Sequence, residues 1–141
     1  MQPRDPGRRD RIIDACLDVI ASDGVDGTSM RRVAAAAEVP LGSMTYHFTG
    51  RDELLREAFE RFATSVSDAF ERRLVAVEPG DREALVRALV DVIGLDVYPD
   101  PRDLVLTHEL YVLAARRPEF RTLTSAWMKQ SRVALERHLD P

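Results

Sequence analysis

Residues 28–48, TSMRRVAAAAEVPLGSMTYHF, decide the fold, because they predict two short helices joined by a tight turn. Thr28 is a hydroxyl residue at a position where a helix can begin, and the apolar residues after it recur at the helical period of 3.6. These residues are Met30, Val33, Ala34 and Ala37. Proline has no amide hydrogen and disfavours helix in the residue before it, so Pro40 separates this helix from a second one that starts at about Leu41.

The second helix has two different faces. Met44 and Phe48 lie four residues apart and share the face that we expect to be buried. The other face carries small, hydroxylated or amphipathic residues, where a free surface helix more often carries Glu or Lys. They are Gly42, Ser43, Thr45, Tyr46 and His47. Together with the alanine run, which permits close helix approach, this pattern predicts a helix-turn-helix whose second helix enters a DNA major groove.

This region resembles a known family. Residues 28–48, preceded by RIIDACLDVIASDGVDG and followed by TGRDELL, are similar to the DNA-binding domain of the tetracycline-repressor (TetR/AcrR) family of bacterial transcriptional regulators. The resemblance is close from about Arg8 to Leu55 and loose after that. Its most specific parts each lie at the family's spacing: the turns at 24–28 and 39–42, the Tyr46-His47-Phe48 ending, and the helix start at 51–54.

The resemblance implies a set of DNA contacts. The groove-facing positions would be Leu41, Gly42, Ser43, Thr45, Tyr46 and His47, and the phosphate contacts would be Thr28, Arg31 and Arg51. Two positions depart from the family, which commonly has a polar residue in place of Leu41 and a tyrosine in place of Thr45. Leucine can contact a thymine methyl group and threonine can hydrogen-bond a base edge, so binding is retained in principle while the preferred operator stays undetermined.

Charge and apolar content limit the class of protein. The net charge of −4 alone would not suggest a nucleic acid partner, but residues 28–51 carry three arginines and His47 against one acid, Glu38. No apolar run approaches the roughly 18 residues of a membrane span, and no signal peptide is recognisable at the start. We therefore expect a cytoplasmic protein. Cys16 lies among apolar residues at helical spacing, which favours a core position over a redox sensor.

Enzymatic patterns are missing from the sequence. His47, His108 and His138 have no metal-ligand spacing, and there is no HExxH, GxSxG or glycine-rich phosphate loop. We therefore expect no enzyme, no cofactor and no metal, and keep an enzyme only as a remote alternative. The better alternative is an all-helical protein-binding module without DNA recognition. Salt-sensitive retention on heparin or random duplex DNA would favour the regulator, and indifference to DNA with a tight protein partner would favour the module.

The whole chain is predicted to be all-α. Beyond the helix-turn-helix, helices are expected at about 8–22, 51–77, 82–93, 102–116 and 119–139, with a mobile arm at 1–7 whose arginines either contact phosphates or stay solvated. The helix at 51–77 keeps a wide apolar stripe that the DNA-binding domain alone could not cover. It should therefore join a DNA-binding domain, residues 1–50, to a helical domain for effector binding and dimerisation, residues 51–141.

The helix at 102–116 is apolar on nearly every side, yet Thr107-His108-Glu109 lies in its middle. In the family that this chain resembles, the C-terminal helices enclose an effector pocket, so His108 and Glu109 would face a small molecule. Further walls of such a pocket would be Tyr98, Tyr111, Trp127 and Met128. The alternative is a packed core in which His108 and Glu109 pair with Arg116 or with solvent.

The C-terminus bears on the oligomeric state. Family members generally continue past the position of His138-Leu139 with one or two helices that complete a dimer interface, whereas this chain ends at Asp140-Pro141. The helix at 119–139 presents a broad apolar surface. Either this is a shortened form of a longer protein, or dimerisation uses the helices at 102–139 alone. We expect a homodimer through the final helix, weaker than is usual for the family. The sequence as a whole predicts a ligand-responsive repressor that binds a palindromic operator.

Overall fold

The computed structural model describes residues 7–93 and 100–139, and these residues form seven α-helices and no strand. The helices are α1 (Arg8–Asp23), α2 (Met30–Ala36), α3 (Leu41–His47), α4 (Arg51–Val75), α5 (Arg82–Ile93), α6 (Pro101–Arg116) and α7 (Pro118–Leu139). The predicted all-α fold is confirmed. The largest difference in the helix bounds is at the end of α4, which stops before Val77.

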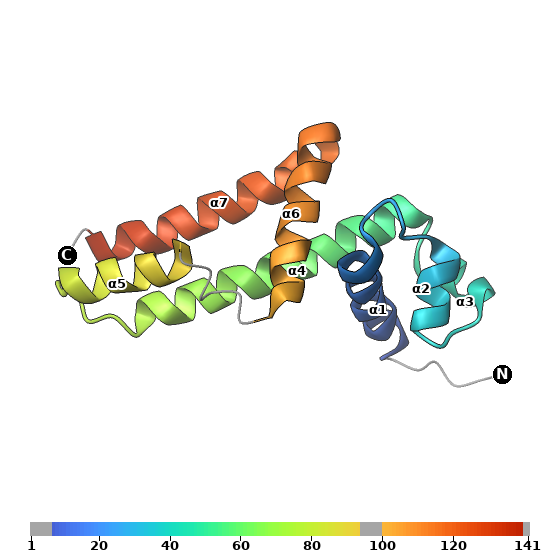
Figure 1. Cartoon of the computed structure of the whole chain (residues 1–141), viewed down its shortest axis with the longest axis horizontal. Coiled ribbons are helices and arrows are strands. Elements are labelled where there is room, and N and C mark those ends of the chain that lie inside the picture. The colour runs from blue at the N-terminus through green and yellow to red at the C-terminus, as the bar shows by residue number, and fades with distance from the viewer. Residues whose placement is uncertain (1–6, 94–99, 140–141) are drawn as a thin grey trace.

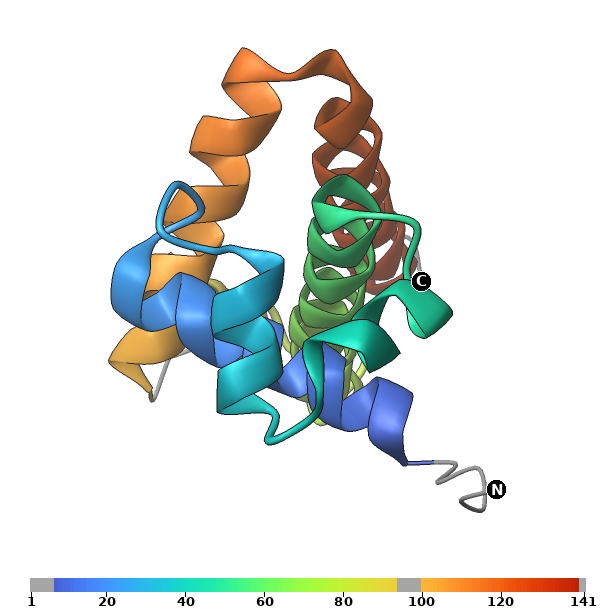
Figure 2. The same ribbon diagram turned by 90° about the vertical axis from the view of Figure 1, so that its right-hand side faces the viewer.

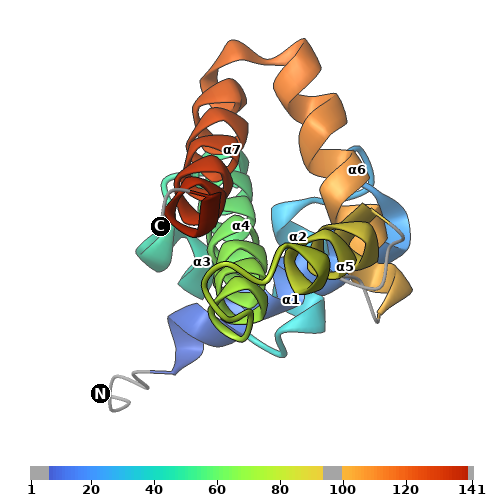
Figure 3. The same cartoon turned by 90° about the vertical axis from the view of Figure 1, so that its left-hand side faces the viewer.

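The molecule is elongated, and α4 runs along most of its length (Figure 1). The three helices α1, α2 and α3 gather at one end, which Figure 2 shows facing the viewer. At the other end α5 lies beside α4 and the C-terminal part of α7 (Figure 3). Between the two ends, α6 packs against α1 and α7, and it joins α7 through a tight connection at Arg117 (Figure 1). This arrangement leaves α3 at an extremity of the molecule.

Short-range capping determines where α2 begins and ends. Its N-cap is Ser29, whose side chain accepts a hydrogen bond from the Arg32 N–H at 3.1 Å, so the prediction that Thr28 starts this helix was wrong by one residue. The helix ends in a Schellman motif. The N–H of Glu38 donates to the carbonyl of Ala35, and the next N–H donates to the carbonyl of Ala34. Glu38 has φ +56°, a left-handed conformation that favours glycine.

The main hydrophobic core does not stop at the end of the helix-turn-helix. Ile12, Met44, Phe48 and Phe59 are at most 2% exposed, and they belong to one cluster with Leu106 and other residues of α6 and α7. A second, smaller cluster at the far end contains Leu74, Val77, Leu85 and Ala134. Since α4 contributes to both clusters, it connects the two halves of the molecule as its apolar stripe predicted. The main core extends across residue 50, so it does not separate two domains at that point. The domain division at residue 50 therefore remains a prediction.

Cys16 lies inside the main core and is fully buried. Burial raises the pKa of its thiol to about 12, although the nearby Arg51 charge acts in the opposite direction. A thiol that stays protonated is a poor nucleophile and is slow to oxidise. The core interpretation of Cys16 is therefore confirmed, and its role is to pack α1.

Candidate nucleic-acid interface

The two faces of α3 differ sharply in exposure. Met44 is 0% exposed and Phe48 just after the helix is 2% exposed, and both anchor α3 in the core. On the opposite face Tyr46 is 73% exposed and Leu41 is 41% exposed. The other predicted groove-facing residues are either exposed, as for Gly42 and Thr45, or half-buried, as for Ser43 and His47. Within residues 7–93 and 100–139, this face of α3 is thus left open to solvent.

The polar groups on this face are held locally. The Ser43 hydroxyl donates to the Pro40 carbonyl at 2.7 Å, and the Thr45 hydroxyl donates to the Gly42 carbonyl at 2.9 Å. Each hydroxyl oxygen can still accept a hydrogen bond from outside. The rings of Tyr46 and His47 meet edge to face, with centroids 5.8 Å apart. This contact orients the two largest polar side chains of the face.

Gly42 stands in this helix without a structural requirement for glycine. A Cβ built at this position would meet nothing within 4 Å, and its φ lies outside the left-handed region. Glycine lowers helix stability by up to about 1 kcal/mol relative to alanine. The open space above the Gly42 backbone allows a partner molecule to approach α3 closely.

The three arginines of the predicted basic patch have different environments. Arg31 is exposed on α2, and no hydrogen bond or ion pair engages it within the part of the chain that the structure describes. Arg32 pairs with Asp23 at the end of α1. Arg51, at the start of α4, is half-buried, and its guanidinium donates to the backbone carbonyls of Thr28, at 2.6 Å, and of Val25. Arg31 is therefore the arginine of this patch best placed to meet a phosphate.

Thr28 also has an internal partner. It is 2% exposed, and its hydroxyl donates to the carbonyl of Gly24 at 2.8 Å, while its N–H donates to the carbonyl of Val25 at 3.0 Å. Thr28 and Arg51 thus both hold the turn at residues 24–28, which leads into α2. The sequence did not predict this function for either residue.

A third group reaches the same turn from α6. The Glu109 carboxylate accepts a hydrogen bond from the Val25 N–H at 2.9 Å, across 84 residues of sequence. Gly24 makes room for it, because a Cβ at Gly24 would lie 3.2 Å from a Glu109 oxygen, and Gly24 also has φ +75°. A polar residue within an apolar helix was the available signal for a specific role. The partner could not be identified from sequence because it is a backbone amide.

Ion pairs hold both ends of α6 against the first helices. At its start, Arg102 binds Asp18 of α1 at 2.9 Å. Just after its end, Arg117 donates to both carboxylate oxygens of Asp52 in α4, at 2.9 and 3.0 Å. The Arg117 hydrogen bond holds the pKa of the Asp52 carboxyl below its usual value of 3.8. Arg102 thus ties α6 to α1, Arg117 ties the end of α6 to α4, and Glu109 is the one of these residues that binds the 24–28 turn.

The structure brings together three of the six residues that the sequence assigned to an effector. The rings of Tyr111 and Trp127 have centroids 5.9 Å apart, and the Tyr111 hydroxyl donates to the Met128 sulfur at 3.4 Å. Trp127 is buried against Phe62, while Tyr111 and Met128 are exposed. This aromatic cluster (Tyr111, Trp127 and Met128) connects α6 to α7.

The remaining effector candidates lie elsewhere. His108 is exposed, with Nδ1 2.9 Å from the Leu104 carbonyl of its own helix, and Glu109 is directed to the 24–28 turn. The alternative interpretation paired His108 and Glu109 with Arg116 or with solvent. Among the described residues neither pairs with Arg116, and His108 is open to solvent. The position of Tyr98 falls outside the described residues.

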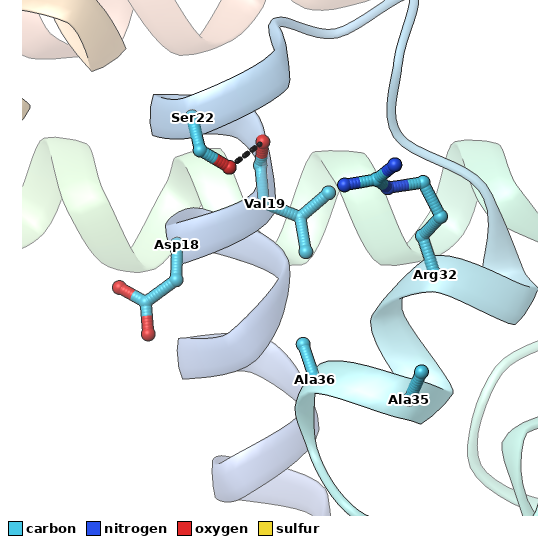
Figure 4. Close-up of a pocket in the computed structure, with 6 residues that line it drawn as sticks. All are labelled: Asp18, Val19, Ser22, Arg32, Ala35 and Ala36. Atoms are coloured by element: carbon cyan, nitrogen blue, oxygen red, sulfur yellow. Dashed lines mark hydrogen bonds between the residues drawn. The ribbon is translucent and has the colours of Figure 1, made fainter.

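A shallow depression between α1 and α2 is separate from both the open face of α3 and the aromatic cluster. Figure 4 shows its lining residues, Asp18, Val19 and Ser22 on α1 and Arg32, Ala35 and Ala36 on α2, with Val19 directed toward Arg32. Its charged groups are already used, since Asp18 binds Arg102 and Arg32 binds Asp23. In the ranges 7–93 and 100–139, no group of three or more His, Cys, Asp or Glu residues could hold a metal ion, and no helix is long and apolar enough to span a membrane.

Comparison with known proteins agrees with this geometry. The family described as "Bacterial regulatory proteins, tetR family" matches residues 12–58, and "Tetracyclin repressor-like, C-terminal domain" matches residues 80–141. The nicotine-responsive transcriptional repressor HdnoR of Paenarthrobacter nicotinovorans is 28% identical over 87% of this chain and 64% of its own length. The chain thus spans less than two thirds of this relative.

Two solved structures are similar over nearly the whole chain. SCO7518 from Streptomyces coelicolor A3(2) is 51% identical, with a TM-score of 0.87 over 96% of this chain and 78% of that protein. The multidrug binding protein EbrR, complexed with ethidium, is 38% identical, with a TM-score of 0.76 over 98% of this chain and 79% of EbrR. EbrR also has structures with proflavin and with malachite green. Because the family matches cover both the helix-turn-helix and the C-terminal helices, the chain belongs to the TetR family of bacterial regulatory proteins.

Proposed function

We propose that this protein is a transcriptional repressor that binds a palindromic DNA operator through α3 and responds to a small molecule. The observation that carries this proposal is the open face of α3, which is anchored by Met44 and Phe48 and presents an exposed Tyr46 at one end of the molecule. A protein-binding module would not need this helix-turn-helix geometry. Membership of a family of regulators supports the same conclusion and argues against an enzyme.

The proposed contacts divide into three kinds. Base edges are read by the face of α3, which consists of Leu41, Gly42, Ser43, Thr45, Tyr46 and His47. Arg31 neutralises a phosphate, because its guanidinium is exposed. Thr28 and Arg51 act chiefly through the 24–28 turn, which positions α2 and Arg31. Any phosphate contact from Arg51 uses the guanidinium N–H groups that are not already bonded to backbone carbonyls.

Binding is tested with a fluorescent duplex from the region upstream of the protein's own gene and with a random duplex of equal length. The expected result is tighter binding to the upstream duplex, and weaker binding to both as salt rises. Tyr46→Ala should reduce the preference between the duplexes, while the matched control Tyr111→Ala, which changes an exposed tyrosine far from α3, should not. Salt-independent indifference of the wild type to both duplexes would overturn the proposal.

The proposed effector is an aromatic cation recognised at the aromatic cluster. Ethidium, proflavin and malachite green, which are bound by EbrR, are of this class, and HdnoR responds to nicotine. Tryptophan and tyrosine rings attract such cations through stacking and cation–π interaction, and methionine adapts to the shape of the ring system. Tyr111, Trp127 and Met128 supply these groups side by side. His108 on the same helix is a peripheral candidate.

Trp127 provides a direct assay, because it is the chain's single tryptophan. Proflavin should quench its emission in a saturable way and raise the melting temperature. Tyr111→Ala should weaken both effects, and the matched control Tyr46→Ala should leave them unchanged. Equal proflavin binding by the two variants would remove the aromatic cluster from the site.

We also propose that the protein acts as a cytoplasmic homodimer that contacts its partner copy through α7. The exposed large apolar residues of α7 are Met128, Val133 and Leu139. Two recognition helices must lie about 34 Å apart to bind successive major grooves of a palindrome. Sedimentation over a concentration series should show reversible dimers. A strict monomer at high concentration would overturn the dimer and would leave binding to a single half-site.

A further inference from the structure

Side chains from two different helices hold Val25 on its two backbone polar groups. The Val25 N–H donates to the Glu109 carboxylate of α6 at 2.9 Å, and the Val25 carbonyl accepts from the Arg51 guanidinium of α4. The carbonyl also accepts from the Thr28 N–H at 3.0 Å. The Val25 side chain is itself buried in the main core. The turn is therefore fixed from both sides by charged groups.

The signs of the charges match the backbone. A carboxylate lies at an N–H group and a guanidinium lies at a carbonyl group, and hydrogen bonds to charged partners are stronger than neutral ones. The fit is close, because any side chain at Gly24 would contact the Glu109 carboxylate. Glu109 is half-buried, so the hydrogen bond is partly shielded from water.

This turn determines where α2 starts. Four residues after Val25 stands Ser29, the N-cap of α2, and Arg31 lies in the first turn of that helix. Because α2 packs against α3, the position of α2 also determines the position of the open face of α3. A shift of the turn would move Arg31 and α3 together relative to α4.

We infer that Glu109 is a positioning residue for DNA binding. Its carboxylate fixes the 24–28 turn and so holds Arg31 and α3 in the geometry that binds DNA, although Glu109 belongs to the C-terminal part of the chain. This inference rests on the proposed DNA-binding function. It assigns to Glu109 a role other than effector contact.

The first test needs no DNA. Hydrogen exchange of the segment that contains Val25 should be faster in Glu109→Ala than in wild type, and Glu109→Gln, which keeps an acceptor oxygen, should restore most of the protection. Arg102→Ala is the matched control, since it removes an α6 contact to α1 and leaves the turn intact. Unchanged exchange in Glu109→Ala would overturn the inference, whether or not the protein binds DNA.

The second test measures affinity for the upstream duplex. Glu109→Ala should weaken binding about tenfold, Glu109→Gln less than about threefold, and Arg102→Ala less than about twofold. In an Arg31→Ala background the loss caused by Glu109→Ala should shrink, because the phosphate contact that Glu109 positions is already missing. A wild type that does not bind DNA contradicts the proposed function. A wild type that binds, with the Glu109→Ala loss equal in both backgrounds, contradicts the positioning role, since a general loss of stability would produce that result.

Discussion

Replacing Arg31 and Arg51 separately by alanine distinguishes a DNA contact from a contact that builds the protein. Arg51 makes two charge-assisted hydrogen bonds to backbone carbonyls at a half-buried site, and Arg31 makes none within the described residues. Family resemblance alone assigned both residues to phosphates. The structure predicts different consequences for the two variants.

The expected loss of stability for Arg51→Ala follows from its two bonds. A hydrogen bond to a charged group contributes about 1.5–3 kcal/mol net, and part-exposure places this pair at the low end, so we expect a total loss of about 3 kcal/mol. For a chain of this size such a loss lowers the melting temperature by roughly 10 °C. Arg31→Ala removes a solvated side chain and should change stability by less than about 0.5 kcal/mol.

In DNA binding the order of the two variants should be reversed: Arg31→Ala should change the salt dependence of the affinity more than Arg51→Ala does. If Arg31 neutralises one phosphate, its removal should reduce the slope of log affinity against log salt by about 0.9 for each subunit bound. Arg51→Ala should weaken binding by loosening the turn, with a smaller change in slope. Arg51→Lys keeps the charge and loses the fork to two carbonyls, so it should destabilise the fold while leaving the slope unchanged.

Thermal denaturation and fluorescence anisotropy at several salt concentrations check these values. The reasoning is refuted if Arg51→Ala melts like the wild type and loses as much salt slope as Arg31→Ala. That result would mean that the Arg51 guanidinium leaves the carbonyls for a phosphate, and that the turn does not depend on it.

Four further predictions concern single positions. Cys16 should stay unreactive toward a disulfide reagent at about pH 8 in the folded protein and react fully in denaturant, because burial raises the pKa of its thiol to about 12; rapid reaction of the native protein would contradict its burial. Glu38→Gly should raise stability by up to about 1 kcal/mol, because glycine adopts the left-handed conformation at φ +56° without steric strain. Part of this gain is lost, because glycine has a larger conformational entropy in the unfolded state. An unchanged or lower melting temperature would contradict this prediction. Gly42→Ala should stabilise the free protein slightly and weaken DNA binding, because its Cβ meets nothing within the protein; undiminished affinity would show that DNA does not approach Gly42 closely. The Arg117 hydrogen bond lowers the pKa of Asp52 in the folded state, so this pair stabilises the protein at pH values above the ordinary pKa of 3.8 and ceases to do so as the pH falls through the lowered pKa. The melting-temperature difference between wild type and Asp52→Asn should therefore be larger at about pH 6 than at about pH 2. A difference that does not change with pH would exclude the pair as its source.

Local signals in the sequence were sufficient for the helices and for the open face of α3. Pro40 and the apolar positions Met44 and Phe48 determine where α3 begins and which side of it is buried, because helix starts and helix faces depend on residues within a few positions of one another. The start of α2 was predicted one residue early because Thr28 and Ser29 are both suitable caps. The choice between them depends on Thr28 being buried in the turn.

The roles of the charged residues were decided by the tertiary structure. Arg51 reaches Val25 and Thr28 across 26 and 23 residues, and Glu109 reaches Val25 across 84. In each of these contacts the partner is a backbone group. Every residue type supplies the carbonyl and every type except proline supplies the N–H, so no pattern of side chains marks the partner in advance. The sequence by itself determined that Glu109, in a nearly apolar helix, needed a partner. Only the packing of α6 across the 24–28 turn determined that the partner is the Val25 amide, because helix packing alone brings these distant groups within hydrogen-bond distance.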